Sequence, residues 1–336
     1  MKQIVTQQMI AKKLGISQSL VSRALRGSAT HIHASPETIE RIRQTAEQLG
    51  YHPSAAALTL RGESSRTIVV VVRDFTDPFL GRLIGALQQT ASADGYSLIL
   101  SGVGSESSGS DYRILFKYGV DGLIVVGGQF EPGAVPAFLR NRLPVVQIGT
   151  GRARAGVQHV AMDVEAGIRM LLDHAAKAGH RSVGFLGDGT ETARFRRGVL
   201  EAELRRRKWP KLAFSFNEAD GPDAGYDGAR ALCGSGRKNA PTVLVATDDA
   251  TAQTALRGFY ECGWRVPDDI SVMGIDDLPS SARCIPALTT LRQPIDELAR
   301  EAFGRILATT PKSPAEVRIP PELVVRESCA APGSRT

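Results

Sequence analysis

Short runs of β-branched residues alternate with longer stretches of helical periodicity through most of the chain. The first run is Thr67–Val72, TIVVVV, which is typical of a strand buried in a parallel sheet. An apolar helical stretch follows from Phe79 to Ala91, and the same alternation starts again near Glu165. Strands that alternate with helices predict an α/β fold with parallel sheets. We therefore expect an α/β core of two doubly wound parallel-sheet subdomains.

Polar and charged residues follow the predicted strands in both halves of this core. Ligands of doubly wound sheets bind outside the carboxyl ends of the strands, and a cleft between two sheets brings both sets of strand ends around one ligand. Carboxylates and arginines there could bind vicinal hydroxyl groups, and an aromatic face could cover a sugar ring. A single aspartate at a strand end can equally cap the next helix. The expected ligand-binding residues are Asp74, Phe75, Phe79, Gln129, Arg194, Arg196, Thr247, Asp248 and Asp276.

The amino-terminal fifth of the chain is basic, whereas the rest is nearly neutral. Residues 1–62 contain eight lysines and arginines but only three glutamates, so they carry five of the six net positive charges. A short basic module on a near-neutral body favours a polyanionic partner, with nucleic acid as the first candidate. A solvated basic surface would give the same count of charges.

Three short helices are predicted in this basic segment, over residues 6–15, 17–27 and 35–50. Each begins at a capping Ser or Thr and ends at a glycine. The second follows the first after a tight turn and combines an apolar face with short polar side chains near its start. A helix that docks on its neighbours and reaches base edges in the major groove needs this combination. A three-helix bundle with a merely polar surface is the alternative. The side chains expected to face outward are Gln18, Ser19, Ser22 and Arg23.

Other classes of protein find little support in the sequence. No stretch approaches the roughly 20 apolar residues that a membrane-spanning helix needs. The four cysteines are widely spaced without a CxxC pair, which predicts free thiols in a reducing cytoplasm. The chain has no P-loop, no complete dinucleotide fingerprint, no GxSxG and no HExxH motif. We expect no enzyme activity, no cofactor and no metal ion.

The chain resembles the LacI/GalR (lactose-repressor) family of bacterial transcriptional regulators. The segments TQQMIAKKLGISQSLVSRAL and SPETIERIRQTAEQLGYHPSAAALTL are similar to its DNA-binding headpiece, and DFTDPF, PTVLVATDD and RVPDDISVMGIDDLP follow in the family's order. The resemblance implies that the second helix reads the major groove and that Ser17 caps it and touches phosphate. It also implies a hinge helix at about 53–61, whose Leu60 opens a base step in the minor groove. The implied DNA-binding residues are Thr6, Ser17, Gln18, Ser19, Ser22, Arg23, Ser54, Ala57 and Leu60.

The chain departs from the family pattern in the predicted ligand site. Thr247 stands where the family often has Asn, and Val164 replaces the Asn that often follows the aspartate of HVAMDV. Phe195 occupies the usual place of the effector-binding arginine, so Arg194 and Arg196 on either side of it both stay candidates. The sequence therefore does not identify the effector. A sugar or sugar derivative is the first candidate, and purines and other small metabolites stay open.

The predicted organisation is one DNA-binding domain and a core of two subdomains that resembles periplasmic binding proteins. Residues 1–62 form the helix-turn-helix domain with its hinge, 63–162 and 294–319 the core N-subdomain, and 163–293 and 320–330 the core C-subdomain. We expect a cytoplasmic homodimer, without a membrane partner, that binds a near-palindromic double-stranded DNA operator and is controlled by a small-molecule effector in the cleft. A repressor is the favoured interpretation. The alternatives are a solute-binding receptor without DNA function and a regulator that has lost its effector response.

Overall fold

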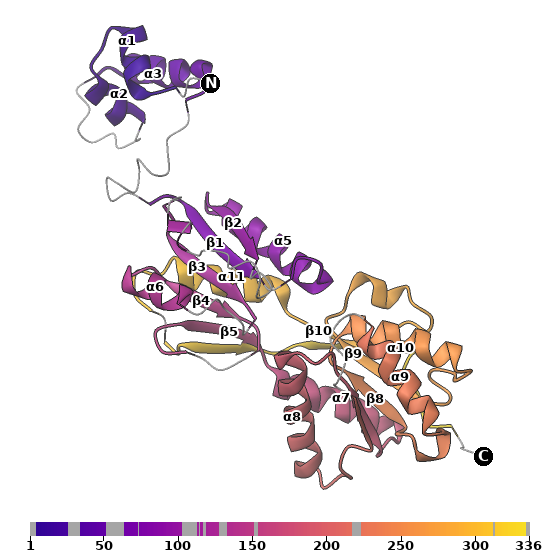
Figure 1. Ribbon diagram of the computed structural model, residues 1–336. Helices are drawn as coiled ribbons and strands as arrows, with labels where there is room; N and C mark the ends of the chain where they lie inside the picture. The colour runs from indigo at the N-terminus through magenta and orange to yellow at the C-terminus, as the bar shows by residue number, and fades with distance from the viewer. Residues whose placement is uncertain are drawn as a thin grey trace. The chain divides into compact units, whose positions relative to one another are not determined.

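The computed structural model divides the chain into two compact units, Met1–Ser65 and Arg66–Thr336 (Figure 1). The described residues are 5–25, 34–51, 64–72, 74–102, 113, 115–116, 119–127, 133–150, 154–216, 223–311 and 313–333. The predicted hinge contacts Ser54, Ala57 and Leu60 lie outside these residues, and so does Gln129. No helix among the described residues is long and apolar enough to cross a membrane.

The described part of the first unit contains three helices, and the caps that can be described are those predicted; Gly27, the predicted end of the second helix, lies outside the described residues. Thr6 accepts a hydrogen bond from the backbone N–H of Met9, and Ser35 accepts one from Thr38. Gly15 and Gly50 end their helices in the left-handed conformation, each with a φ of 68°, which favours glycine. The predicted helices are thereby confirmed as α1 (Gln7–Leu14), α2 (Gln18–Leu25) and α3 (Pro36–Leu49).

One small core holds these helices together. Ile10 of α1, Val21 of α2 and Ile42 of α3 belong to the same buried cluster, and none of them is exposed. Leu20 packs against this cluster, as the predicted apolar face of α2 requires. The prediction that Ser22 faces outward is wrong. Because α2 packs against both α1 and α3, its buried face is wider than one stripe, and the Ser22 side chain is only 8% exposed.

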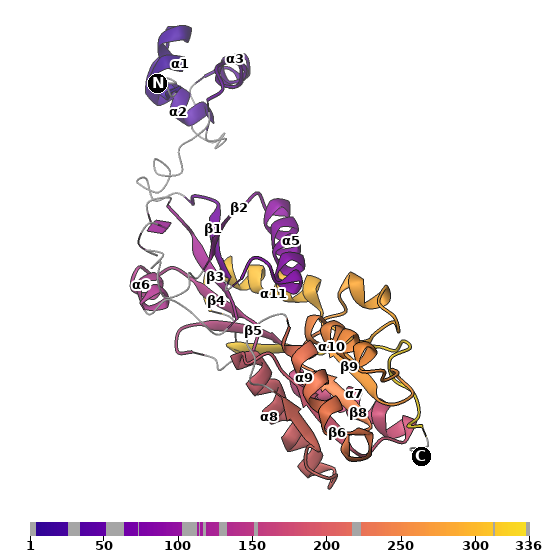
Figure 2. The same ribbon diagram turned by 45° about the vertical axis from the view of Figure 1, so that its right-hand side comes forward.

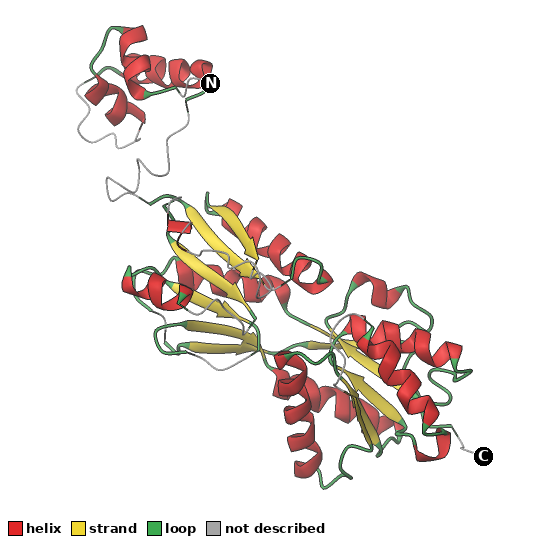
Figure 3. Cartoon of the chain, in the orientation of Figure 1, coloured by secondary structure: helices red, strands yellow, loops and turns green. Residues whose placement is uncertain are grey.

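The second unit contains two six-stranded sheets (Figures 1 and 3). All strands of the first sheet are parallel, in the order β11-β5-β4-β3-β1-β2. They are β1 (Thr67–Val72), β2 (Ser97–Gly102), β3 (Gly122–Val126), β4 (Val145–Ile148), β5 (Gln158–Met162) and β11 (Glu316–Ile319). The helices of this first lobe are α5 (Pro78–Ala93), α6 (Ala134–Arg140) and α11 (Ile295–Ile306).

Helices cover both faces of the first sheet. Leu87 of α5 and Phe303 of α11 pack in one cluster with Val70 of β1, and α5 and α11 lie side by side in Figures 1 and 2. Phe138 of α6 packs in a second cluster with Val69, the neighbour of Val70 in the strand. Successive residues of β1 therefore face opposite helix layers, and this burial on both sides explains why TIVVVV is apolar throughout.

The second sheet has the order β12-β10-β9-β8-β6-β7. Its strands are parallel except β12, which pairs antiparallel with β10, so the predicted parallel sheet carries one antiparallel edge strand. The strands are β6 (Val183–Leu186), β7 (Phe214–Phe216), β8 (Val243–Ala246), β9 (Ser271–Ile275), β10 (Thr289–Arg292) and β12 (Glu322–Val324). The helices of this second lobe are α7 (Val164–Ala178), α8 (Glu191–Arg206), α9 (Ala224–Gly234) and α10 (Asp249–Glu261), with short 3-10 helices η3 (Arg237–Asn239) and η4 (Pro279–Ala282).

The second sheet is also covered on both faces. Phe185 of β6 packs with α7 and α8 in one cluster, whereas Leu244 of β8 packs with Phe259 of α10 in another. Helices α9 and α10 pack closely at Gly225, where an added Cβ would stand 1.9 Å from the carbonyl oxygen of Thr251. The prediction of two doubly wound units is confirmed.

The chain passes between the two lobes three times. Asp163 joins β5 to α7, Gln293 and Pro294 join β10 to α11, and Pro320 and Pro321 join β11 to β12. All three connections are short, so the two lobes lie next to each other with their strand ends on either side of one cavity.

Candidate ligand cleft and DNA-binding helix

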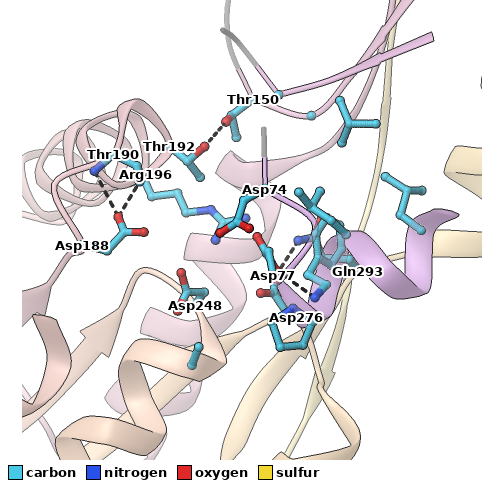
Figure 4. A pocket seen from close by; sticks show the side chains of 18 of the residues that line it. Asp74, Asp77, Thr150, Asp188, Thr190, Thr192, Arg196, Asp248, Asp276 and Gln293 are labelled. Atoms are coloured by element: carbon cyan, nitrogen blue, oxygen red, sulfur yellow. Dashed lines mark hydrogen bonds between the residues drawn. The ribbon is translucent and has the colours of Figure 1, made fainter. Parts of the chain in front are cut away.

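A cavity of about 640 Å³ lies between the two lobes of the second unit (Figure 4). Its walls are built by residues that follow β1, β3 and β4 in the first lobe and β6, β8 and β9 in the second. The carboxyl ends of both sets of strands therefore face one space, as is typical of ligand sites in doubly wound folds. The cavity has the size of a small-molecule site.

Six of the nine residues predicted to bind a ligand line this cavity, namely Asp74, Phe79, Arg194, Arg196, Asp248 and Asp276. Phe75 does not line it. The Phe75 side chain is 53% exposed and lies over Gly102 of β2, where an added Cβ would come within 2.9 Å of the ring. Thr247 does not line the cavity either, because its side chain is buried behind the end of β8. Its backbone carbonyl oxygen accepts a hydrogen bond from Nη1 of Arg196, and Arg196 does line the cavity.

Other cavity residues were not among those predicted. Asp188 follows β6 and Thr150 follows β4, so the rule that identified Asp74 applies to them too. Thr192 of α8 forms a 2.8 Å hydrogen bond between its hydroxyl and that of Thr150, across the cleft from the first lobe to the second. Gln293 stands in the connection from β10 to α11, and nothing in its sequence context signals a site.

Asp248 caps α10 and lies half-buried at the cavity wall. Its Oδ1 accepts a 2.7 Å hydrogen bond from the backbone N–H of Thr251. Burial raises the pKa of Asp248 to about 6, and the negative charge of Asp188 acts in the same direction. The Thr251 N–H and the Arg196 guanidinium oppose this shift without cancelling it. Asp248 therefore takes up a proton close to neutral pH.

Asp276 is 5% exposed and has an unusual backbone φ of 130°. Its Oδ1 accepts a 2.5 Å hydrogen bond from Nε2 of Gln293. Burial raises the pKa of Asp276 well above its usual value; Arg196 opposes the shift, and the charges of Asp248 and Asp249 add to it. A side chain held in a left-handed backbone region at the wall of a cavity is typical of a functional position.

Arg196 is the one buried cation that lines the cavity in the described part of the chain. It comes from α8 and is 5% exposed, and its Nη1 donates to the Thr247 carbonyl oxygen. Its Nε has no hydrogen-bond partner among the described residues. Arg194 is exposed and donates instead to the carbonyl oxygen of Gly189. The two arginines that the sequence left as alternatives therefore differ in burial.

Asp249 follows Asp248 directly but has a different role. It is completely buried, and its Oδ2 accepts hydrogen bonds from the Leu278 N–H at 2.8 Å and the Ser281 hydroxyl at 2.5 Å. Its Oδ1 accepts another from the Thr290 hydroxyl. Asp249 fixes the segments around β9 and β10 and does not reach the cavity.

Most of the described side chains predicted to contact DNA belong to α2 and its cap, with Gln18 and Ser19 in the first turn and Arg23 in the last turn. Ser17 caps this helix, since its Oγ accepts a hydrogen bond from the Leu20 N–H at 3.3 Å. Gln18, Ser19 and Arg23 are exposed, and Arg23 Nε donates to the Ser19 carbonyl oxygen. Thr6 is also exposed, at the start of α1. Contact of these residues with DNA stays a prediction.

The chain is similar to known regulators along nearly its whole length. A model of the periplasmic binding protein-like domain family matches residues 172–329. The HTH-type transcriptional regulator PtxS of Pseudomonas aeruginosa is 29% identical over 332 residues, which cover 96% of this chain and 95% of PtxS. The alignment therefore includes both units.

Solved structures show the same fold. The lac repressor dimer bound to operator and an anti-inducer matches 98% of this chain and 100% of its own, with a TM-score of 0.83 and 24% identity. The complex of the regulator CelR with cellobiose matches 96% and 99%, with a TM-score of 0.68 and 24% identity. Because the likeness to regulators spans both units, the chain is a ligand-responsive, DNA-binding transcriptional regulator and not an enzyme, and it is similar to regulators of the LacI/GalR family.

Proposed function

We propose that the protein acts as a homodimer that places one α2 helix in each half-site of a near-palindromic operator. The observation that carries this proposal is the set of exposed polar side chains on α2, Gln18 and Ser19 in its first turn and Arg23 in its last turn, on a unit that holds most of the net positive charge. A two-fold protein matches a two-fold operator. The lac repressor, which has this fold, was crystallised as a dimer on its operator.

Ser54, Ala57 and Leu60, which lie outside the described residues, complete the proposed DNA contacts near the centre of the operator. Leu60 would act there as an apolar wedge between base steps in the minor groove. Thr6 and Ser17 would contact phosphate groups, which fix the position of the protein without reading sequence. A regulator with this target acts in the cytoplasm.

The effector in this proposal is a small, sugar-like molecule in the cavity between the lobes. Asp74, Phe79, Arg196, Asp248 and Asp276 would contact it. Carboxylates and a guanidinium suit vicinal hydroxyl groups, and Phe79 suits the apolar face of a ring. CelR, a regulator of this fold, binds cellobiose.

Effector binding would control DNA binding by changing how the lobes close on each other. The hydrogen bond between Thr150 and Thr192 joins the lobes across the cleft, and a ligand that adds further contacts favours closure. A coupling free energy of about 1–3 kcal/mol is typical of such regulation. We propose that the protein is a repressor whose affinity for the operator changes when the effector binds.

Capture of genomic DNA tests this function. The purified full chain is mixed with fragments of the source genome at near-physiological salt, and retained fragments are sequenced, with the Arg23→Ala variant as the matched control. We expect one near-palindromic site to be enriched by the wild type and less by the variant. Equal, sequence-independent retention by both proteins at low salt only would contradict the proposal.

A further inference from the structure

The cavity carries more negative than positive charge. Six carboxylates line it: Asp74, Asp77, Asp188, Glu191, Asp248 and Asp276. Only two guanidinium groups line it in the described part of the chain, those of Arg194 and Arg196. Arg194 is exposed, so Arg196 alone stands among these carboxylates as a buried cation (Figure 4).

Neutral donors satisfy several of these carboxylates without balancing their charge. Asp188 accepts from the N–H and hydroxyl of Thr190. Asp248 accepts from a backbone N–H in the same way. These bonds orient the carboxylates, but N–H and O–H groups carry no net charge, so the negative potential in the cavity persists.

Asp248 and Asp276 experience this potential most strongly. Burial raises the pKa of both carboxyl groups. The negative charge of Asp188 further raises the pKa of Asp248, and the negative charge of Asp248 further raises the pKa of Asp276. Arg196 is the one charged group that acts in the opposite direction on both. Without a ligand, this part of the cavity is short of positive charge.

Arg196 itself needs a hydrogen-bond acceptor from the ligand. The residue is 5% exposed, and its Nε, which is buried and donates to no group among the described residues, belongs to a side chain that lines the cavity. A buried donor without a partner is costly, and an acceptor such as a hydroxyl oxygen would satisfy it. The ligand should therefore offer acceptor oxygens as well as positive charge.

A metal ion does not fit this need. No group of three or more His, Cys, Asp or Glu side chains among the described residues is placed to hold one. The cation is therefore organic, and an ammonium group with its three N–H donors is the common choice that can bridge two carboxylates.

We propose that the effector is a polyhydroxylated amine of monosaccharide size, such as an amino sugar, whose ammonium group binds between Asp248 and Asp276 while a hydroxyl oxygen accepts a hydrogen bond from Arg196. This inference rests on the proposed function, in which the cavity holds the effector. It disfavours phosphorylated sugars and carboxylic acids, since their negative charge would meet the same six carboxylates.

Matched pairs of amine and neutral probe test the inference. Binding of glucosamine and glucose, of galactosamine and galactose, and of Tris and pentaerythritol is measured by calorimetry on the full chain in phosphate buffer. We expect at least one amine to bind about tenfold or more tightly than its neutral counterpart near pH 7.5. Its affinity should fall toward pH 5, because Asp248, whose pKa is raised to about 6, takes up a proton that competes with the cation.

Two capping aspartates provide the matched variants. Asp248→Asn keeps a side chain that can cap α10 but removes the charge. It should reduce the affinity for the amine about tenfold more than it reduces the affinity for the neutral partner. Asp163 caps α7 in the same way, by accepting from the Ala166 N–H at 2.8 Å, and does not line the cavity. Asp163→Asn should change neither affinity.

The inference is overturned if no amine binds at millimolar concentration. It is also overturned if a neutral sugar or glucose 6-phosphate binds at least as tightly as the amine with the highest affinity. The genomic capture experiment separates this failure from a failure of the proposed function. If the operator is found and the amines do not bind, only the charge of the effector is wrong. If no operator is found, the regulatory function itself is wrong.

Discussion

The guanidinium of Arg82 donates a hydrogen bond across the cleft to the backbone carbonyl oxygen of Asp277, at 2.8 Å. Arg82 comes from α5 of the first lobe, whereas Asp277 follows β9 of the second. The same Nη1 lies 3.2 Å from the carbonyl oxygen of Asp276. Arg292 and Arg326 hold the carboxylate of Asp277 at 2.7 and 2.5 Å. The acceptor of the bond from Arg82 is therefore fixed to the second lobe.

Arg82→Ala should favour an open arrangement of the lobes. A hydrogen bond from a charged donor contributes about 1.5–3 kcal/mol, so its loss should shift the equilibrium between closed and open forms by that amount. Small-angle X-ray scattering should show a larger radius of gyration for the variant without ligand. Gln89→Ala, which changes an exposed residue of the same helix, is the control. An unchanged radius for Arg82→Ala would show that the bond does not hold the cleft closed.

Asp248→Asn should stabilise the protein in the absence of ligand, and more so at higher pH. Because the pKa of Asp248 is raised to about 6 by folding, wild-type stability falls as pH rises from the unfolded value of about 4 through the folded one. The variant does not lose stability in this way. Its free energy of unfolding should exceed that of the wild type by about 1–3 kcal/mol near pH 7.5 and by about half of that near pH 5. Urea unfolding at both pH values measures the gain. Asp94→Asn, at an exposed site, should show no such trend.

Gly225→Ala should destabilise the second lobe severely. The added methyl group would lie 1.9 Å from the Thr251 carbonyl oxygen, so α9 and α10 must move apart. Overpacking of this kind costs about 1–3 kcal/mol or more, and thermal unfolding should reveal it. Gly234→Ala in the same helix meets no atom within 4 Å and should leave stability nearly unchanged. Equal melting temperatures for the two variants would contradict the close approach.

Ile42→Ala should unfold the first unit and leave the second intact. Ile42 is fully buried in a core of three short helices, and truncation of a buried Ile to Ala costs about 2–5 kcal/mol. A unit of this size has little more stability than that. DNA binding should be lost, whereas calorimetry should still show the unfolding transition of the second unit. Ile42→Val, which removes one methyl group, should retain DNA binding.

Arg23→Ala should relax the sequence preference at one base pair of each half-site. An exposed arginine on a recognition helix that contacts guanine contributes about 1–3 kcal/mol of discrimination. Fluorescence anisotropy with single-base variants of the captured operator measures this change. Arg41→Ala, an exposed change on α3, should at most weaken binding to all of these operators alike. A uniform loss for Arg23→Ala would identify Arg23 as a phosphate contact.

Local signals in the sequence predicted much of this fold. Thr6, Ser35, Gly15 and Gly50 define helix ends through their own backbone and side-chain chemistry, which neighbouring residues do not alter. The strand TIVVVV was equally clear because burial on both faces requires apolar residues throughout. The burial of Ser22 was not predicted, since it depends on how three helices pack together.

The residues of the site could be predicted where they directly follow the carboxyl end of a strand, because ligands of doubly wound sheets bind there. Asp74, Asp248 and Asp276 lie at the cavity for that reason. The same rule misplaced Phe75 and Thr247, because it gives the position of the backbone and not the direction of the side chain. Whether a polar residue at a strand end faces the cavity depends on turn geometry and on the packing of distant segments.

The three short connections between the lobes have a consequence for how such a protein can diversify. The segment that leads from the DNA-binding unit continues directly into β1 of the first lobe. Residues 163–292 form a single insertion into the first lobe. They build all of the second lobe except β12 and the end of the chain. An exchange of this insertion, together with the β12 segment, for that of a relative would replace one wall of the cavity. The helix proposed to contact DNA would stay unchanged, so recognition of metabolites and recognition of operators can evolve separately.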